Sequence, residues 1–222
     1  NNDAQFTFDD GSGLNSSIER GFLGIASQDN LVYIAYSSQD NNETYDPQFP
    51  LIKESYSLVV DEYSMNFSKV RNIIKIGGFQ LNHYSGTLLF DNLGKLYLSV
   101  GDGYDRDQAQ NLNSLKGKIL RLDVSTLKLE PEIIAYGIRS PWGGTIDSKD
   151  RMFILQCGST NVEAVYLLND LYSGIPANLG WPVFEGSTRI EYGEITDETE
   201  VRKGPLRFKD IVAPIFETKN RP

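Results

Sequence analysis

The feature that most restricts the fold is a strand–turn–strand pattern that recurs along the chain. Its clearest copy runs from Thr87 to Val100, with Asp91-Asn92-Leu93-Gly94 as the turn, where glycine accepts a positive φ. After the turn, Leu96, Leu98 and Val100 alternate with polar or aromatic residues, as a β-strand requires. Similar hairpins are predicted within 21–36 and 144–156, so the pattern repeats roughly every 60 residues.

The strands that follow each hairpin recur as well. Tyr56 to Tyr63 followed by Val70 to Gly77 resembles Lys118 to Val124 followed by Glu132 to Gly137. We therefore predict an all-β β-propeller in which each blade is a four-stranded antiparallel sheet, with three to four blades in this chain. The alternative is a β-sandwich with coincidentally similar hairpins. It is disfavoured because both the spacing and the order of strand types recur.

The chain is predicted to be one propeller domain, residues 1–222. Residues 1–18 are polar and form an extended lead-in, and the mostly charged segment 186–210 is expected to be surface loop. A closed propeller needs its last blade to meet its first, because an open sheet edge exposes unpaired backbone groups. We therefore expect a fragment of a longer protein, or a protein completed by another segment.

Charge and composition exclude several partners. A formal net charge of −9 disfavours binding to a nucleic-acid backbone, and no apolar run is long enough to span a bilayer. The single cysteine, Cys157, excludes an internal disulfide. Three N-x-S/T triplets, at Asn15, Asn42 and Asn66, would suit a secreted or periplasmic-type protein, although such triplets also arise by chance. Compartment and oligomeric state stay open.

His83, the only histidine, is the clearest candidate for chemistry. A neutral imidazole can take a proton from an alcohol near pH 7. Because His83 precedes a predicted strand, it is expected on a loop rather than within the sheet. The alternative is a loop histidine that bonds to backbone, and position alone favours that alternative.

The glycine-rich loop after the clearest hairpin holds three aspartates that could bind a cation: Asp102, Asp105 and Asp107. An EF-hand loop that starts at Asp102 needs glycine at its sixth position and glutamate at its twelfth, where this chain has Asp107 and Asn113. The pattern by itself therefore favours a solvated turn.

Arg139 lies between Gly137 and Pro141, in a tight connection. A guanidinium held there can pair with a carboxylate or polarise a carbonyl, although a structural salt bridge between blades is the commoner role. Trp142 and Trp181 are interpreted as packing residues.

Five segments, taken in order, resemble the glucose/sorbosone dehydrogenase family, the soluble quinoprotein aldose dehydrogenases. They are GFLGIA at 21–26, HYSGTLLFDNLGKLYLSVGDG at 83–103, QNLNSLKGKILRLDV at 110–124, YGIRSPWG at 136–143 and GWPVFEG at 180–186. The resemblance implies a six-bladed propeller that binds pyrroloquinoline quinone (PQQ) and Ca²⁺ on its loop face.

The resemblance also assigns roles to residues of this chain. His83 is implied to be the general base that removes the proton of a sugar's anomeric hydroxyl while hydride passes to the quinone, and Arg139 is implied to contact that quinone. Further cofactor-side positions are Glu19, Asp102, Asp107 and Ser140. The backbone carbonyls of Gly158 and Ser159 are implied to hold calcium, with Glu163 as an additional acidic group.

The chain departs from the family pattern at several of these positions. Ser140 replaces the usual asparagine after the arginine, Ser159 replaces a proline, and Glu163 is what remains of an acidic pair. The sequence is therefore compatible with two functions. One is a dehydrogenase that oxidises an aldose to its lactone, with an unidentified electron acceptor. The other is a non-catalytic propeller that binds carbohydrate or protein or has a structural role. A hydrolase-type propeller is a remaining alternative.

Overall fold

The computed structural model describes residue 19 and residues 21–40, 56–80, 82–127, 129–160, 162–190 and 211–219. In these ranges the protein is all-β apart from one short 3₁₀ helix, η1 (Arg106–Ala109). Among the same residues, no helix combines the length and apolar character needed to cross a membrane. The lead-in predicted at 1–18 lies outside the described residues.

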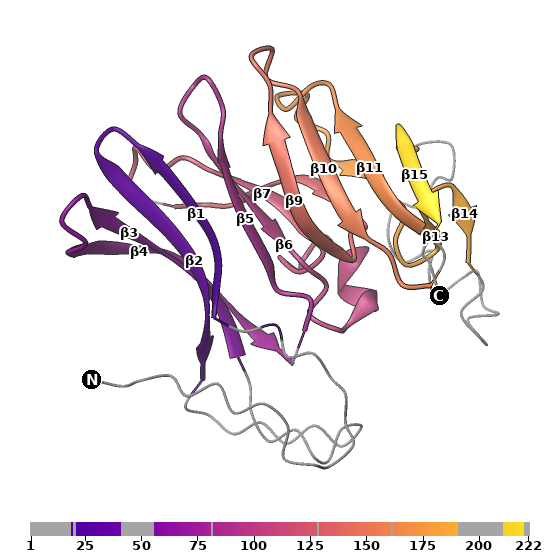
Figure 1. Ribbon diagram of the computed structural model, residues 1–222, viewed down its shortest axis with the longest axis horizontal. Coiled ribbons are helices and arrows are strands. Elements are labelled where there is room, and N and C mark those ends of the chain that lie inside the picture. Colours follow the sequence, from indigo (N-terminus) through magenta and orange to yellow (C-terminus); the bar gives the residue numbers. More distant parts are fainter. Residues whose placement is uncertain are drawn as a thin grey trace.

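Three antiparallel sheets follow one another along the chain (Figure 1). The first contains β1 (Phe22–Gln28), β2 (Leu31–Gln39), β3 (Tyr56–Ser64) and β4 (Lys69–Phe79), in that order. The second contains β5 (Ser85–Phe90), β6 (Leu96–Val100), β7 (Lys118–Leu122) and β8 (Glu132–Tyr136). The third contains β9 (Ser140–Ile146), β10 (Met152–Cys157), β11 (Val162–Leu168) and β15 (Phe216–Lys219).

The three predicted hairpins are confirmed as the first two strands of each sheet. Strands β2 and β4 continue a few residues beyond the hairpin predicted within 21–36 and the strand predicted from Val70 to Gly77. A short strand, β12 (Ala177–Asn178), adds a parallel fifth member beside β8. A small hairpin of β13 (Phe184–Glu185) and β14 (Thr188–Arg189) lies across the start of the surface segment predicted at 186–210, and residues 191–210 lie outside the described ranges.

Alternating side chains build two apolar cores, one on each face of the second sheet. Leu96, Leu98 and Leu120 are buried against the first sheet, whereas Tyr97 and Ile119 belong to the core shared with the third sheet. This follows from the period of two along a strand, which sends neighbouring side chains to opposite faces. The sheets are thereby stacked face to face, as propeller blades are.

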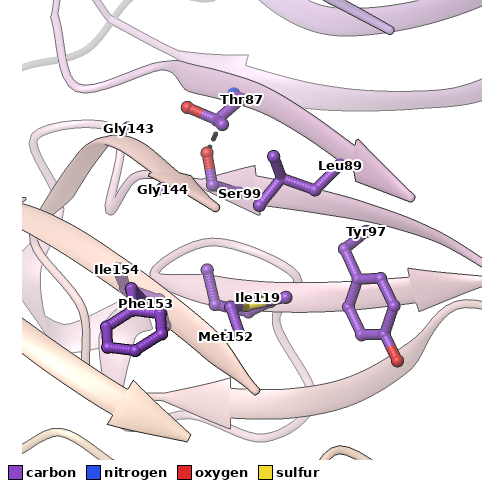
Figure 2. Close-up of a pocket in the computed structure, with 10 residues that line it drawn as sticks. All are labelled: Thr87, Leu89, Tyr97, Ser99, Ile119, Gly143, Gly144, Met152, Phe153 and Ile154. Carbon is purple, nitrogen blue, oxygen red and sulfur yellow. Dashed lines mark hydrogen bonds between the residues drawn. The ribbon is translucent and has the colours of Figure 1, made fainter. Parts of the chain in front are cut away.

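The first strands of the three sheets, β1, β5 and β9, lie side by side (Figure 1). Glycines allow this approach, since a Cβ added at Gly24 would collide with the carbonyl of Gly86. Between the second and third sheets the packing leaves a cavity of only about 10 Å³ (Figure 2). Ser99 Oγ links the two sheets at this interface. It accepts a hydrogen bond from the N–H of Thr87 at 2.9 Å and donates one to Pro141 O at 3.2 Å.

The outward face of the third sheet carries apolar side chains that the described chain leaves open. Trp142, Leu155 and Phe216 are each at least half exposed. They line a shallow hollow of about 590 Å³ together with Cys157 and Glu163.

Chain direction decides which residues share an edge of the sheets. The residues before β1, β5 and β9 and those after β6 and β10 lie at one edge, because antiparallel strands alternate in direction. The tight turns at 29–30, 91–95 and 147–151 lie at the opposite edge. Positive φ angles at Asp29 and Asn30 mark the first of these turns.

Candidate functional site

Most of the predicted site residues meet at the first of these edges. Glu19, His83 and Arg139 each lie just before the first strand of a sheet, and Asp102 and Gly158 follow β6 and β10. Their sequence positions are up to 139 residues apart, from 19 to 158, and the stacking of the sheets brings them into one network of hydrogen bonds.

The backbone of His83 is held in the left-handed region, with φ = 61°. Its N–H donates to Glu19 Oε2 at 2.7 Å, and its carbonyl accepts the N–H of Gly103 at 3.3 Å. A Cβ at Gly101 would collide with this carbonyl. A non-glycine residue at positive φ costs on the order of 1–3 kcal/mol and persists where surrounding contacts determine it. These contacts fix the backbone of His83 and therefore the position from which its side chain extends.

The imidazole is paired with a buried carboxylate. His83 Nδ1 lies 2.6 Å from Asp102 Oδ1, and both side chains are nearly inaccessible to solvent. Asp102 Oδ1 also accepts the N–H of Tyr104 at 3.0 Å, and Oδ2 accepts the indole Nε1–H of Trp181 at 2.9 Å.

These contacts assign the histidine tautomer. An indole nitrogen and a backbone amide can only donate, so both oxygens of Asp102 act as acceptors. The proton of the neutral imidazole therefore lies on Nδ1, directed at Asp102, and the lone pair lies on Nε2. An imidazole in this state can accept a proton at Nε2, while the carboxylate stabilises the imidazolium that results.

Tyr104 lies against the imidazole. The two ring centroids are 4.9 Å apart, with the rings tilted by 41°, and the tyrosine remains about half exposed. Tyr104 also has a positive φ, 70°. The imidazole is thus bordered by an accessible aromatic ring.

Arg139 joins the loop of the third sheet to the loop of the second. Its carbonyl accepts the N–H of Asp102 at 2.8 Å, and its Nη1 donates to Gly158 O at 2.8 Å. The guanidinium carbon lies 5.6 Å from the centre of the Trp181 ring, within range of a cation–π contact. The imidazole and the guanidinium are therefore linked through Asp102 and Trp181.

The loop after β10 is arranged by two carboxylates. Glu163 accepts the N–H of Gly158 at 3.2 Å. Glu185, which is fully buried, accepts the N–H groups of Ser159, Thr160 and Val162 with a single oxygen, at 2.5, 2.9 and 3.3 Å. Burial, with Glu163 nearby, raises the pKa of the Cys157 thiol. A raised pKa makes this thiol less readily ionised than a free cysteine.

A buried lysine on β7 holds the acidic loop after β6 in place. The fully buried Lys118 Nζ donates to the carbonyls of Gln108, Ala109 and Lys116 at 2.8, 3.1 and 2.6 Å. Burial lowers the pKa of Lys118 to about 7. Nearby, the side-chain amides of Gln110 and Asn178 bond to each other at 3.0 and 3.1 Å. Both contacts fix the loop that carries Asp102.

Two predicted positions stand apart from the network. Asp107 lies exposed on η1. Ser140 is fully buried, and its Oγ has no hydrogen-bond partner within the described part of the chain.

Sequence reasoning treated Trp181 as a packing residue and did not select Glu185 or Lys118. A signal existed for Lys118, because it shares strand parity with the apolar Leu120 and Leu122.

The calcium position that the resemblance implies is engaged by a cationic side chain of this chain. Among the described residues, no three His, Cys, Asp or Glu side chains are grouped as a metal site would require. The carbonyl of Gly158 already accepts a hydrogen bond from the positively charged side chain of Arg139. A divalent cation bound to that oxygen at the usual 2.3–2.6 Å or so would lie beside the guanidinium.

Comparison with known proteins identifies related sequences. The family model described as Glucose / Sorbosone dehydrogenase matches residues 14–214. The chain is 30% identical over 177 residues to the HIPL1 protein of Arabidopsis thaliana, a match that covers 59% of this chain and 25% of that protein. It is 24% identical over 165 residues to the human Hedgehog-interacting protein, covering 61% of this chain and 24% of that one.

A shorter match connects the chain to an enzyme. It is 36% identical over 73 residues to the aldose sugar dehydrogenase YliI of Escherichia coli (strain K12), covering 28% of this chain and 20% of the enzyme. The chain thus spans about a quarter or less of each of these relatives.

Solved structures share the fold. The PQQ-bound aldose sugar dehydrogenase from Streptomyces coelicolor matches with a TM-score of 0.61 and 21% identity, over 94% of this chain and 56% of that one. The soluble aldose sugar dehydrogenase from Escherichia coli, in its apo-form, matches with a TM-score of 0.59 and 23% identity, over 87% and 55%.

Proposed function

The chain belongs to the glucose/sorbosone dehydrogenase family, and from this premise we propose that it carries the base of a quinone-dependent sugar dehydrogenase that oxidises an aldose to its lactone. The observation that supports this most directly is the buried pair of His83 and Asp102, at 2.6 Å, with the imidazole lone pair on Nε2. A base of this kind has a defined task in alcohol oxidation.

In the proposed reaction His83 Nε2 takes the proton of the anomeric hydroxyl. The oxygen–hydrogen bond breaks as the carbon–oxygen double bond of the lactone forms, and Asp102 stabilises the imidazolium. PQQ, when bound, supplies the acceptor for the hydride that leaves the anomeric carbon. The half-exposed ring of Tyr104 lies beside His83, where it would contact one side of the sugar.

The residues present fit a quinone that carries carboxylates. Arg139 lies at the same edge as His83, and among the described residues its side chain bonds to the loop after β10 through Nη1 alone, so its Nε and Nη2 donors are proposed to receive a carboxylate. Glu19, Asp107 and Ser140 remain proposed cofactor-side positions.

Calcium does not fit beside Arg139 as this residue is placed. The carbonyl of Gly158, one of the proposed calcium ligands, is engaged by the guanidinium. Binding at Gly158 and Ser159, with Glu163 nearby, would require Arg139 to release that oxygen. No step of the proposed reaction is routed through the ion.

Titration of the intact protein with PQQ tests the proposal, followed by dye reduction with a panel of aldoses, each with and without Ca²⁺. We expect stoichiometric quinone binding and turnover, binding weakened by Arg139→Gln, and turnover lost in His83→Gln with quinone binding retained. Quinone that fails to bind, or His83→Gln that turns over normally, would refute the proposal.

A second candidate function is a non-catalytic propeller that binds a protein or carbohydrate. It is favoured by the Arg139 contact at the calcium position and by the similarity to HIPL1 and the Hedgehog-interacting protein. Under this reading His83→Ala leaves the biological role unchanged. A folded His83→Ala variant that loses that role would exclude it.

We also propose that the complete protein is a six-bladed propeller. The apolar outward face of the third sheet, with Trp142, Leu155 and Phe216 exposed, supports a further sheet packed there. The share of the solved structures that this chain spans, 55–56%, agrees with about half of such a ring. Fluorescence of Trp142 in the intact protein tests this, since a covering sheet shifts its emission to shorter wavelength and a solvated indole does not.

An extracellular or periplasmic-type location is proposed on the triplet at Asn66. This residue is exposed in the turn between β3 and β4, where an N-linked glycan would meet no neighbouring sheet. Glycosidase treatment of the secreted protein should remove more mass from the unsubstituted form than from Asn66→Gln, because the triplets at Asn15 and Asn42 are present in both. Equal losses of mass would leave this triplet without support.

A further inference from the structure

We propose that Trp181 is a positioning residue that holds Asp102, and through it His83, in the orientation needed for proton transfer. The kinetic part of this proposal rests on the proposed function, whereas its geometric part does not. Trp181 Nε1 donates to Asp102 Oδ2 at 2.9 Å, while His83 Nδ1 faces Oδ1 of the same carboxylate at 2.6 Å.

The two oxygens of Asp102 have different partners, so the carboxylate cannot rotate without losing several bonds. Oδ1 faces His83 and accepts the Tyr104 amide, and Oδ2 accepts the indole. Asp102 and Trp181 are both almost fully buried, where a hydrogen bond to a charged group contributes more than it does in water. Removal of the indole N–H leaves Oδ2 without this donor and frees the carboxylate to turn.

The indole is itself fixed by its backbone. The N–H of Trp181 donates to Gly137 O at 2.9 Å, and its carbonyl accepts Gln110 Nε2 at 2.6 Å. Gln110 is in turn paired with Asn178, which lies in β12 beside β8. A segment that follows β11 of the third sheet therefore supplies the donor that orients a carboxylate of the second.

The ring and the N–H of Trp181 make separate contacts. The ring lies 5.6 Å from the guanidinium carbon of Arg139, and the N–H bonds to Asp102. Trp181→Phe keeps an aromatic ring over Arg139 but removes the donor. It therefore isolates the contact on which the proposal depends.

The test is NMR of the intact protein with ¹⁵N-labelled histidine and tryptophan. Signals of His83 and Trp181 are assigned by difference from His83→Gln and Trp181→Phe, and Trp142→Phe serves as the matched control on an exposed indole. In the unsubstituted protein we expect a protonated Nδ1 and an unprotonated Nε2 on His83. Trp181→Phe should raise the solvent exchange rate of the Nδ1 proton at least tenfold, and Trp142→Phe should not.

A second measurement alters Asp102, the residue through which Trp181 is proposed to act. Asp102→Asn should shift the indole N–H resonance of Trp181 and leave that of Trp142 in place. In the Asp102→Asn background, Trp181→Phe should have no further effect on His83, because the residue through which it acts has been altered. An effect that persists there would show a general packing role and overturn the proposal.

Kinetics complete the test. Trp181→Phe should lower kcat about tenfold while quinone affinity stays within about twofold, since the ring over Arg139 is kept. If the NMR result is as expected but no variant turns over an aldose, the proposed function fails and the positioning role stands. If the Nδ1 proton exchanges at the same rate in Trp181→Phe, the positioning role fails whatever the activity.

Discussion

The amide of Asp102 donates to the carbonyl of Arg139 at 2.8 Å, which ties the loop after β6 to the loop before β9. This bond fixes the distance between the backbones of Asp102, the partner of the candidate base, and Arg139, the candidate quinone-binding residue. Their side chains converge again at Trp181, whose N–H bonds to Asp102 and whose ring lies by the Arg139 guanidinium. Two sheets thus contribute to one site.

Tyr104 should determine sugar affinity more than turnover. Its ring lies 4.9 Å from that of His83 and is half exposed, so it offers an apolar face to a bound sugar. Tyr104→Ala is expected to raise KM about 3- to 10-fold, corresponding to roughly 0.5–1.5 kcal/mol, with little change in kcat. Steady-state kinetics measure both constants. Tyr104→Phe is the control and should resemble the unsubstituted protein, and a tenfold loss of kcat alone in Tyr104→Ala would contradict this role.

Glu185 should be the main support of the loop after β10. Its buried Oε1 accepts three backbone N–H groups, which Glu185→Ala leaves without an acceptor. We expect the free energy of unfolding to fall by about 2–4 kcal/mol, as measured by urea denaturation. Glu132→Gln is the matched control, because that carboxylate is half exposed in its ion pair with Arg121, and should cost less than about 1 kcal/mol. Equal losses in the two variants would contradict the assignment.

Adjacent glycines in β9 should respond differently to the same substitution. A Cβ at Gly144 would lie 2.5 Å from the backbone oxygen of Phe153, whereas one at Gly143 meets the side chain of Leu155 at 3.3 Å. Leu155 is half exposed and can move. Gly144→Ala is expected to destabilise the protein by about 1–3 kcal/mol and Gly143→Ala by much less. Thermal unfolding of the pair measures the difference, and similar melting temperatures would show that β10 shifts freely.

Lys118 should make stability depend on pH. Burial lowers its pKa in the folded protein to about 7, below the ordinary value of 10.5. Between pH 7 and 10.5 this lysine is protonated in the unfolded chain but largely neutral in the folded protein. The free energy of unfolding therefore rises as pH increases across this window, and the gain is lost as pH falls back to 7. The slope is at most about 1.4 kcal/mol per pH unit. Urea unfolding at pH 7, 8 and 9 should show this rise in the unsubstituted protein but not in Lys118→Met. Parallel profiles would mean that the buried amine keeps its proton.

The sequence predicted the elements whose signal is local. Alternation and turn residues located the three hairpins, and the position of His83 before a predicted strand indicated that it lies on a loop at the end of the sheet. These predictions succeed because side-chain periodicity and strand direction together determine which residues share a face and an edge.

The contacts that orient the site were not predictable in the same way. The bond from Trp181 to Asp102 joins residues 79 positions apart, and it depends on the path of the connection after β11, which has no periodic pattern. Glu185 lies about 25 residues after the amides that it accepts. Charged residues such as Lys118 are usually exposed, so its burial contradicts the ordinary expectation for lysine, although its place among Leu120 and Leu122 on one strand face was a usable indication.

The separation of the two sheet edges has a practical consequence. The exposed turn at Asp29 and Asn30 lies opposite the edge that holds His83 and Arg139, and loop tips of this kind accept inserted peptide. An affinity handle placed between these two residues would anchor the molecule to an electrode or a bead with its reactive loops facing the bulk solution.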